Sequence, residues 1–468
     1  MTSINATIFA PLTALGHAAI HAVRVSGPGV KELVLSNTHR AEEILKKPRT
    51  FVYSRLDNLA GQVIDFAMCA FFEGPKSYTG EDVCEFQIHG SPVILKNLLD
   101  DLSQRGLRLA EPGEFTRRAY LNGQMDLSQA EAIADLIHAE SAEQVRVARE
   151  QLEGKLSGAV DKVGEPLRDL LSEIEAFIDF PEEDIDPQTH LAWQSALQKT
   201  QAELFNLSSS FNQGRIFREG ARVVLAGLPN AGKSSLLNAL LGENRAIVTP
   251  IPGTTRDTIE EKISLQGLLI RLTDTAGIVL EQTREIDPVE QLGIARSREQ
   301  IEKADLVLFL IDCVALKLPA ELATTLKLYR QVTQTNKSVF AVLTKVDLLS
   351  EIEQIDALHK LKEISVAKIS TLTGQGIKEL CQSIPEQLLQ ARRQNGTEVM
   401  ICTARHFQAL KSAESALERA RQGSQTNLAP ELISFEVREA LSQLDEIIGV
   451  THTEEILGRI FSKFCIGK

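Results

Sequence analysis

The most chemically informative residues form one run, Gly227–Ser234, with the sequence GLPNAGKS. The apolar run Arg222–Ala226 before it is typical of a buried strand, and Ser235–Leu241 after it is typical of an amphipathic helix. A strand, a glycine turn and a helix start together aim backbone N–H groups at an anion. Lys233 would reach the β- and γ-phosphates of a nucleotide, and the Ser234 hydroxyl would bind Mg²⁺. The alternative is an ordinary strand–turn–helix without a ligand.

A second acidic motif follows another apolar run, at Leu272–Gly277 with the sequence LTDTAG. Asp274 would hold the Mg²⁺ through water, and the Gly277 N–H would meet the γ-phosphate. The apolar runs Asp305–Asp312 and Ser338–Leu343 predict two more buried strands.

The second of these strands leads into Thr344–Asp347, with the sequence TKVD. This resembles the guanine-reading motif of the GTPases, usually Asn-Lys-x-Asp. The Asp347 carboxylate can accept both the N1–H and the N2–H₂ of guanine, and the stem of Lys345 can lie across the base. Thr344 replaces the usual Asn, which weakens one contact. By itself the motif would suggest a solvated loop, but in order behind the two earlier motifs it predicts GTP.

A switch segment is predicted between the phosphate loop and Asp274, at Gly253–Asp257. Thr255 would be a second Mg²⁺ ligand, made only when the γ-phosphate is present. The residue after Gly277 is Ile278, where Ras-like enzymes carry the Gln that orients the attacking water. An aliphatic side chain cannot do this, so the residues alone leave the source of that polar group open.

Composition limits the class of protein. The 468 residues allow about three domains, and the net charge of −13 argues against a surface that coats nucleic acid generally. Six cysteines without a Cys-x-x-Cys spacing predict reduced cytoplasmic thiols. The nearly uncharged stretch Ile4–Val23 lacks a basic start, which favours buried strands over a signal sequence. No run is long enough to span a membrane. His17, His21 and His89 show no ligand spacing, so no metal is assigned to them.

The periodicity predicts a multidomain protein with α/β and all-α parts. Residues up to about Asn122 read as mixed α/β, with strands at Ala22–Val25 and Val83–Ile88. A helical period starts near Asp126, stops for the GTPase segment and resumes from about Glu386, which suggests a doubly wound α/β GTPase domain inserted into a helical domain. The predicted domains are 1–122 (N-terminal α/β), 123–216 (first helical part), 217–386 (GTPase) and 387–468 (second helical part).

Motifs outside the GTPase segment carry a closer resemblance. They are Ser77–Val83 (SYTGEDV), Arg108–Thr116 (RLAEPGEFT), Leu121–Gly123 (LNG) and the terminal Phe464–Lys468 (FCIGK). With the nucleotide motifs they resemble the MnmE/TrmE family of tRNA-modification GTPases over nearly the whole chain. The resemblance implies a Ras-like GTPase domain, and an N-terminal domain that binds a tetrahydrofolate and forms a homodimer.

The resemblance also implies how GTP is hydrolysed. In the family, K⁺ beside the phosphates supplies positive charge in place of an arginine finger, and the GTPase domains approach each other when GTP and K⁺ bind. By position, Asn230 would be the side-chain ligand of K⁺, with Thr249, Ile251 and Thr254 from the switch loop. Glu290 would be the missing water-orienting group, although without the family it reads as a surface carboxylate on a helix.

Taken together, the motifs and the resemblance predict a set of GTP contacts over three segments. They are Asn230, Ala231, Gly232, Lys233, Ser234 and Ser235; Thr249, Pro250, Ile251, Pro252, Gly253, Thr254 and Thr255; Asp274, Thr275, Ala276 and Gly277, with Thr344, Lys345 and Asp347 at the base.

For the modification itself, the resemblance implies a heterotetramer with the FAD-binding partner MnmG. The pair would add a carboxymethylaminomethyl-type group to carbon 5 of the wobble uridine of certain tRNAs. The one-carbon unit would come from 5-formyl- or 5,10-methylene-tetrahydrofolate. Arg24 and Glu85 would hold the folate, and Lys468 could reach it. Cys465 would be either a nucleophile or a structural thiol.

Two departures from the family bear on folate. The family's N-terminal turn, usually Pro-Pro-Gly-x-Gly-Gly-Ile-Gly, reads LTALGHAAIH at Leu12–His21, and alanine restricts positive φ. Gln124 stands where members usually have Lys. An alternative is therefore a scaffold that binds GTP but no folate. A further alternative is a ribosome-assembly GTPase of the Era/Der kind, for which the chain lacks a basic RNA-binding module. A tRNA-contacting face around Arg392, Arg393, Arg405, Lys411, Arg419 and Arg421 competes with ordinary solvated helices.

Overall fold

The computed structural model describes residues 6–179, 187–244, 260–274, 288–336, 338–361, 364–390, 399–451 and 453–468. The chain divides into two compact units, which are described separately. Unit 1 contains Met1–Ala134, Gln151–Gly164 and Leu441–Lys468, and unit 2 contains Asp135–Glu150 and Glu165–Ala440. The boundaries of the four predicted domains stay a prediction.

Unit 1 is built on a six-stranded mixed sheet of order β3-β4-β5-β2-β1-β6. All neighbours pair antiparallel except β1 and β6, which are parallel. The predicted strands at Ala22–Val25 and Val83–Ile88 are confirmed as β2 and β5, which occupy the middle of the sheet. The strands are β1 (Ile8–Pro11), β2 (Ile20–Ser26), β3 (Val52–Asp57), β4 (Val63–Phe72), β5 (Val83–His89) and β6 (Arg108–Leu109).

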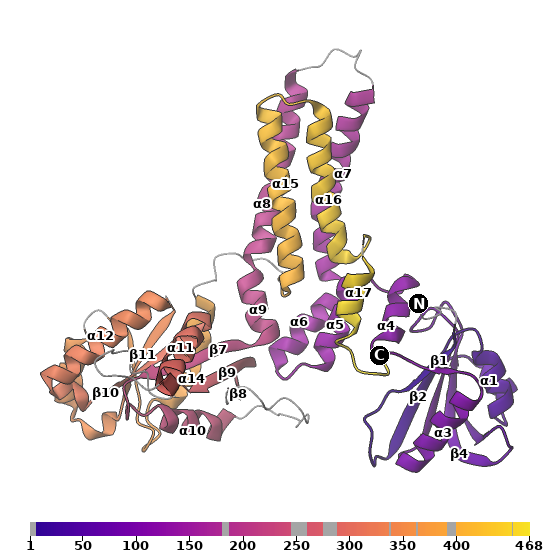
Figure 1. The fold of residues 1–468 in the computed structure, drawn as a ribbon, viewed down its shortest axis with the longest axis horizontal. Helices are drawn as coiled ribbons and strands as arrows, with labels where there is room; N and C mark the ends of the chain where they lie inside the picture. The colour runs from indigo at the N-terminus through magenta and orange to yellow at the C-terminus, as the bar shows by residue number, and fades with distance from the viewer. Residues whose placement is uncertain are drawn as a thin grey trace. The chain divides into compact units, whose positions relative to one another are not determined.

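Helices cover one face of this sheet, as Figure 1 shows. Apolar residues of α1, α2 and α3 pack with alternate residues of the strands, such as Val23, Phe86 and Phe71, into one buried core. A smaller core around Phe115 of α4 lies against Ile8 and Ala10 of β1. The helices of this unit include α1 (Val30–Asn37), α2 (Ala41–Lys46), α3 (Pro92–Gln104), α4 (Glu114–Leu121), α5 (Leu127–Ile137) and the C-terminal α17 (Glu454–Phe461).

Unit 2 contains a second six-stranded sheet, of order β12-β11-β10-β7-β9-β8. Five strands run parallel, and β8 at the edge pairs antiparallel with β9. The predicted strands before the phosphate loop and before TKVD are confirmed as β7 and β11, with β10 between them. The strands are β7 (Ala221–Gly227), β8 (Glu260–Leu265), β9 (Leu268–Asp274), β10 (Leu306–Asp312), β11 (Val339–Thr344) and β12 (Val366–Lys368).

Helices lie on both faces of the parallel sheet, as the predicted doubly wound α/β fold requires. One buried core joins the strands to α9, α10 and α14, and another joins them to α11, α12 and α13. The predicted fold class is confirmed. The helices are α9 (Phe211–Glu219), α10 (Lys233–Asn244), α11 (Pro288–Lys303), α12 (Pro319–Thr335), α13 (Glu351–Lys360) and α14 (Ile377–Gln390), with 3₁₀ turns η1 (Ala315–Lys317) and η2 (Val346–Leu348).

Long helices from both sides of the GTPase segment run alongside one another in Figure 1. Trp193 of α8 is fully buried and meets Phe177 of α7 edge to face, with ring centroids 5.5 Å apart. Gln201 of α8 donates to Glu418 of α15 at 2.8 Å, so segments more than two hundred residues apart form one bundle. The bundle helices are α7 (Lys155–Asp179), α8 (Pro187–Ser209), α15 (Ala404–Gln425) and α16 (Pro430–Ile448). The shorter α6 (Ala142–Leu152) lies beside α5, and α5, α6, α7 and α16 have residues in both units.

Candidate functional site

The nucleotide motifs of unit 2 lie at one edge of its sheet. The phosphate loop follows β7, Asp274 ends β9, and Thr344 ends β11. Since these strands are parallel, their carboxyl ends share an edge, which is where ligands bind in open α/β sheets. The three motifs therefore meet in space, although Ala231 of the first and Thr344 of the last are 113 residues apart in the sequence.

The phosphate loop turns with three residues of positive φ: Gly227 at 147°, Asn230 at 62° and Gly232 at 94°. A Cβ on Gly227 would lie 2.6 Å from the Leu310 carbonyl oxygen, so this position accepts only glycine. Asn230 is exposed and lies in the left-handed region that Asn tolerates. The loop thus leads directly into the first turn of α10, which begins at Lys233.

Lys233 lies inside this loop. Its ammonium donates to the carbonyl oxygens of Gly227 and Leu228, both at 3.1 Å. Burial lowers the pKa of Lys233, and the nearby Asp274 carboxylate opposes that shift. A buried cation on a loop of backbone N–H groups is suited to binding the polyphosphate of a nucleotide.

Ser234 and Asp274 have the donor set of a Mg²⁺ site. The Ser234 hydroxyl donates to Asp274 Oδ2 at 3.0 Å. Asp274 Oδ1 is buried, and no group in the described part of the chain donates to it. A hard cation that brings its own waters would satisfy such an oxygen. The residues present therefore fit Mg²⁺ held by Ser234 and, through water, by Asp274.

Thr344 joins the guanine motif to the phosphate loop. Its side chain is 2% exposed, and its hydroxyl lies 2.8 Å from the Ala231 carbonyl oxygen and 3.2 Å from that of Ile311. Lys345 has a φ of 58°, and its ammonium pairs with Asp312 at 2.6 Å. Asp347 is exposed at the start of the next turn. Thr344 therefore has a positioning contact that its sequence alone did not reveal.

Several predicted GTP and K⁺ residues lie outside the described residues, so their contacts stay predictions. Glu290 falls within α11, but its side chain is not among those described. The predicted residues outside the described ranges are Thr249, Pro250, Ile251, Pro252, Gly253, Thr254, Thr255, Thr275, Ala276 and Gly277, together with Arg392 and Arg393.

In unit 1, Arg24 and Glu85 form an ion pair on the sheet. They are register partners on β2 and β5, with the guanidinium 2.8 Å from the carboxylate and both side chains largely buried. Arg24 Nη1 is buried, and no acceptor is found for it among the residues that the structure describes. A buried donor without a partner is costly, and a ligand with an acceptor group would satisfy it.

Two aromatic rings enclose Arg24, and the sequence did not single them out. The guanidinium carbon lies 4.6 Å from the Tyr78 ring centroid and 5.5 Å from that of Phe115. Burial raises the pKa of Tyr78, while its hydrogen bond with Thr116 and the charge of Arg24 oppose the shift. Tyr78 and Phe115 lie within motifs that carry the family resemblance, which is the only sequence signal for them.

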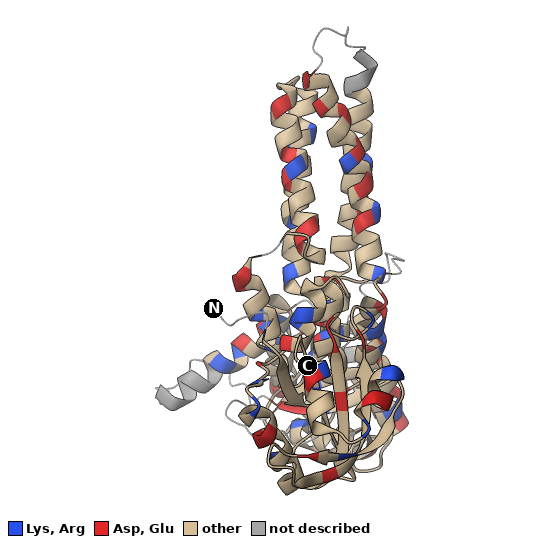
Figure 2. Ribbon diagram, turned by 90° about the vertical axis from the view of Figure 1, so that its right-hand side faces the viewer, with Lys and Arg blue, Asp and Glu red and all other residues tan. Residues whose placement is uncertain are grey.

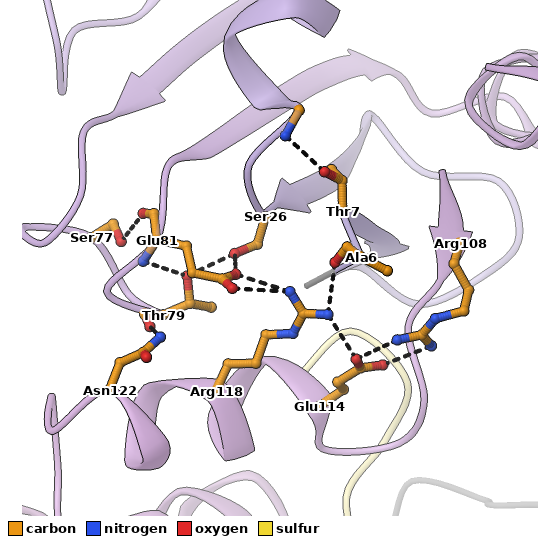
Figure 3. A network of polar contacts seen from close by, with 11 residues as sticks. Ala6, Thr7, Ser26, Ser77, Thr79, Glu81, Arg108, Glu114, Arg118 and Asn122 are labelled. Carbon is orange, nitrogen blue, oxygen red and sulfur yellow. Dashed lines mark hydrogen bonds and ion pairs between the residues drawn. The ribbon is translucent and has the colours of Figure 1, made fainter. Parts of the chain in front are cut away.

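A buried ion network holds these motifs in place (Figure 3). Arg118 is 4% exposed and lies between two carboxylates, at 3.0 Å from Glu81 and 3.0 Å from Glu114. Glu81 also accepts from the Ser26 hydroxyl at 2.6 Å. Asn122 donates to the Thr79 carbonyl oxygen at 2.7 Å. The motif residues around Tyr78 are thus tied to α4 and to β2.

The chain terminus approaches the same pair. Burial and the charge of Arg24 lower the pKa of Lys468, and Glu85 opposes the shift. Cys465 is exposed, and Gln124 is exposed beside Gly80, whose added Cβ would lie 3.2 Å from Gln124 Nε2. The charges of Arg24 and Glu85 therefore both act on the Lys468 ammonium.

Three of the cations considered for a tRNA face, Lys411, Arg419 and Arg421, are paired with carboxylates. Lys411 pairs with Glu414 at 2.6 Å, Arg421 with Glu418 at 2.7 Å, and Arg419 with Glu436 at 2.6 Å. Figure 2 shows Lys and Arg mixed with Asp and Glu along these helices. This pattern is that of solvated helix faces.

Within the described ranges, no cluster of three or more His, Cys, Asp or Glu side chains could hold a metal ion. Among the described helices, none has the length and apolar character needed to cross a membrane.

Comparison with known proteins gives matches along nearly the whole chain. Residues 7–124 match the family model described as "GTP-binding protein TrmE N-terminus", and residues 127–465 match "MnmE helical domain". The tRNA modification GTPase MnmE of Syntrophotalea carbinolica is 40% identical over 99% of both chains. That of Aquifex aeolicus is 40% identical over 98% of this chain and 99% of its own. Among solved structures, the G domain of the T. maritima FeoB iron transporter is 30% identical, covering 36% of this chain and 98% of that one, with a TM-score of 0.28.

Proposed function

The chain belongs to the MnmE family and is a GTPase that acts in tRNA modification, and we propose that the loop Gly227–Ser234 and Asp274 bind its nucleotide and Mg²⁺. The observation that carries the GTPase part is the loop Gly227–Ser234 at the carboxyl edge of the parallel sheet, with Lys233 inside it and Asp274 beside Ser234. Lys233 would neutralise phosphate charge, Ser234 and Asp274 would hold Mg²⁺, and Asp347 would accept from guanine. Thr255 would complete the Mg²⁺ site in the GTP state.

We further propose that K⁺ stimulates the hydrolysis. Asn230 would supply its side-chain ligand, with Thr249, Ile251 and Thr254 from the switch segment, and Glu290 would orient the attacking water. The exposure and left-handed conformation of Asn230 support this assignment, since an exposed amide on the phosphate loop is accessible to a cation.

Turnover of GTP in KCl and in NaCl tests this proposal. We expect hydrolysis to be faster in KCl, and Asn230→Ala to remove the difference while GDP binding remains. Glu290→Ala should lower hydrolysis by roughly a hundredfold, the order found for a lost acid–base group. Equal rates in the two salts would contradict the K⁺ assignment. If the wild-type chain did not bind GTP, the assignment of the nucleotide site would be wrong.

The Arg24–Glu85 pair is proposed to bind a tetrahydrofolate that supplies a one-carbon unit for carbon 5 of the wobble uridine. Glu85 would accept paired pterin N–H groups, and Arg24 Nη1 would donate to a folate acceptor. Lys468 offers a further cation. Gln124 cannot replace the charge of a lysine. We expect saturable binding of 5-formyltetrahydrofolate by the wild-type chain and its loss in Arg24→Ala; absence of binding in wild type would favour a scaffold without folate.

Two assemblies are proposed: a homodimer, and a heterotetramer with the FAD-binding partner MnmG. An apolar patch on the sheet of unit 1 supports the homodimer, because Tyr53 is 55% exposed, Phe66 45% and Ile20 52%. Register pairs Tyr53 with Met68 and places them on one face of β3 and β4. Large exposed apolar patches mark protein interfaces. We expect a dimer mass in gel filtration and a monomer after Phe66→Glu; an unchanged mass would place the interface elsewhere.

A further inference from the structure

The loop between β1 and β2 has an unusual construction. It runs from Leu12 to Ala19, and its residues Ala14–Ala19 are exposed. Gly16, with a φ of 122°, is the residue in it with a positive φ. An exposed loop of this length with little glycine needs side chains to fix its course, because few of its backbone groups pair with one another.

The side chain of His21 supplies such contacts. The side chain is 0% exposed, and its register partner on β5 is the buried Ile88. His21 Nε2 lies 2.8 Å from the Gly16 carbonyl oxygen, which can only accept, so Nε2 donates. Nδ1 lies 3.1 Å from the Thr13 hydroxyl. Both ring nitrogens of a buried histidine are thus used to hold one loop.

Backbone contacts extend this arrangement on both sides. Thr13 Oγ1 also accepts from the Ala22 N–H at 3.3 Å, and the Leu12 N–H donates to the Ala22 carbonyl oxygen at 2.8 Å. At the far end, the Ala18 N–H donates to the Gly90 carbonyl oxygen at 3.0 Å. The loop is therefore fixed at its start, its middle and its end.

The start of the loop also meets the chain terminus. A Cβ added to Gly467 would lie 2.2 Å from the Pro11 carbonyl oxygen, so the terminal segment passes directly against β1 at the point where the loop begins. Lys468 follows Gly467 and is electrostatically coupled to Arg24 and Glu85. A loop that shifts at Leu12 and Thr13 would move the surface on which Gly467 rests.

We propose that His21 is a positioning residue for the Arg24–Glu85 site: it holds the loop 12–19, and through Pro11 and Gly467 it sets the position of Lys468. The identity of the ligand in this inference rests on the proposed folate function, whereas the contacts between His21 and the loop do not depend on it.

Four variants of the full chain test this role. His21→Ala removes both ring contacts, and Thr13→Val removes the hydroxyl while keeping the shape. Thr13→Ser keeps the hydroxyl, and His17→Ala is the matched control, because His17 is an exposed histidine in the same loop. Each variant is measured by hydrogen exchange of the peptide covering 12–22, by titration with 5-formyltetrahydrofolate, and by GTP turnover.

We expect faster exchange in the loop and roughly tenfold weaker folate binding for His21→Ala and Thr13→Val, as the loss of one or two buried hydrogen bonds gives. GTP turnover should not change, and Thr13→Ser and His17→Ala should behave as wild type. Unchanged exchange in a folded His21→Ala would overturn the loop contact. Faster exchange with unchanged folate affinity would overturn the positioning role. If wild type binds no folate, the proposed folate function fails, whereas the exchange data still decide whether His21 holds the loop.

Discussion

The nucleotide site of unit 2 and the Arg24 site of unit 1 differ in how the residues of each site are held in place. In the first, the backbone makes the site: Gly227, Asn230 and Gly232 turn the loop, and Lys233 rests on its carbonyl oxygens. Strand ends bring in Asp274 and Thr344. The geometry of this site is therefore largely specified by a short run and by the sheet on which it sits.

In the second, side chains from distant segments make the site. Arg24 and Glu85 come from the sheet, Tyr78 from a loop, Phe115 from α4 and Lys468 from the terminus. The buried network around Arg118 keeps these segments in register. A site of this kind depends on tertiary packing at a distance from its ligand, so the two sites should respond differently to mutation.

The largest effect is expected for Arg118→Ala. Removing the guanidinium leaves Glu81 without the cation that it pairs with and leaves Glu114 with Arg108 alone, which should cost about 3–5 kcal/mol of stability around the Arg24 site. Hydrogen exchange of peptides from β5 and α4 measures this loss. Fluorescence of Trp193, the single tryptophan and a residue of unit 2, should keep its urea midpoint.

Arg117→Ala is the matched control for this variant. It removes an arginine from the adjacent position of α4, but its partner Glu454 is 79% exposed, so about 0–1 kcal/mol is expected. Equal losses in the two variants would mean that the network of Arg118 has no special role in holding the site.

A middle-sized effect is expected in the nucleotide site. Thr344→Val removes the buried hydroxyl, whose single hydrogen has the Ala231 carbonyl oxygen as its nearer acceptor and that of Ile311 as its farther one. GDP affinity should fall roughly tenfold, as loss of a buried hydrogen bond gives. Calorimetric titration measures it, with Thr344→Ser expected to stay near wild type. Equal GDP affinities for Thr344→Val and wild type would show that the backbone alone fixes the phosphate loop.

The contrast also explains what the sequence could predict. The phosphate loop and the strands β7, β10 and β11 follow from local spacing and apolar runs, and all are confirmed as elements of the structure. Arg24 and Glu85 were named only through a resemblance, because their pairing depends on the register of β2 with β5.

Other features could not be predicted, for physical reasons. The contact of Tyr78 with Arg24 depends on where a loop crosses the sheet, and no periodicity encodes that. His21 lacks ligand spacing and therefore gave no signal, although its buried ring holds a loop. Thr344 was expected to weaken a contact, and its hydroxyl proves to reach the phosphate loop.

The smallest effect is expected from Lys468, which can be compared with Lys233 of the nucleotide site. Burial lowers the pKa of both Lys233 and Lys468, but the neighbouring Asp274 opposes the shift at Lys233, whereas Arg24 adds to it at Lys468. Between the lowered pKa of Lys468 and the 10.5 of a free lysine, the unfolded chain binds more protons than the folded one. Stability therefore gains a small contribution as the pH rises through this window, and charged Lys468 costs stability below it.

Lys468→Met should remove that contribution. Thermal unfolding of wild type and variant between neutral pH and about pH 10.5, the range set by lysine titration, should show the variant's relative stability greatest at the lower pH and declining as the pH rises. Lys463→Met, at an exposed position of the same terminal segment, is the control and should run parallel to wild type. If the curve of Lys468→Met also runs parallel to wild type, Lys468 is fully solvated and does not share the environment of Arg24, which would remove it from the proposed folate site.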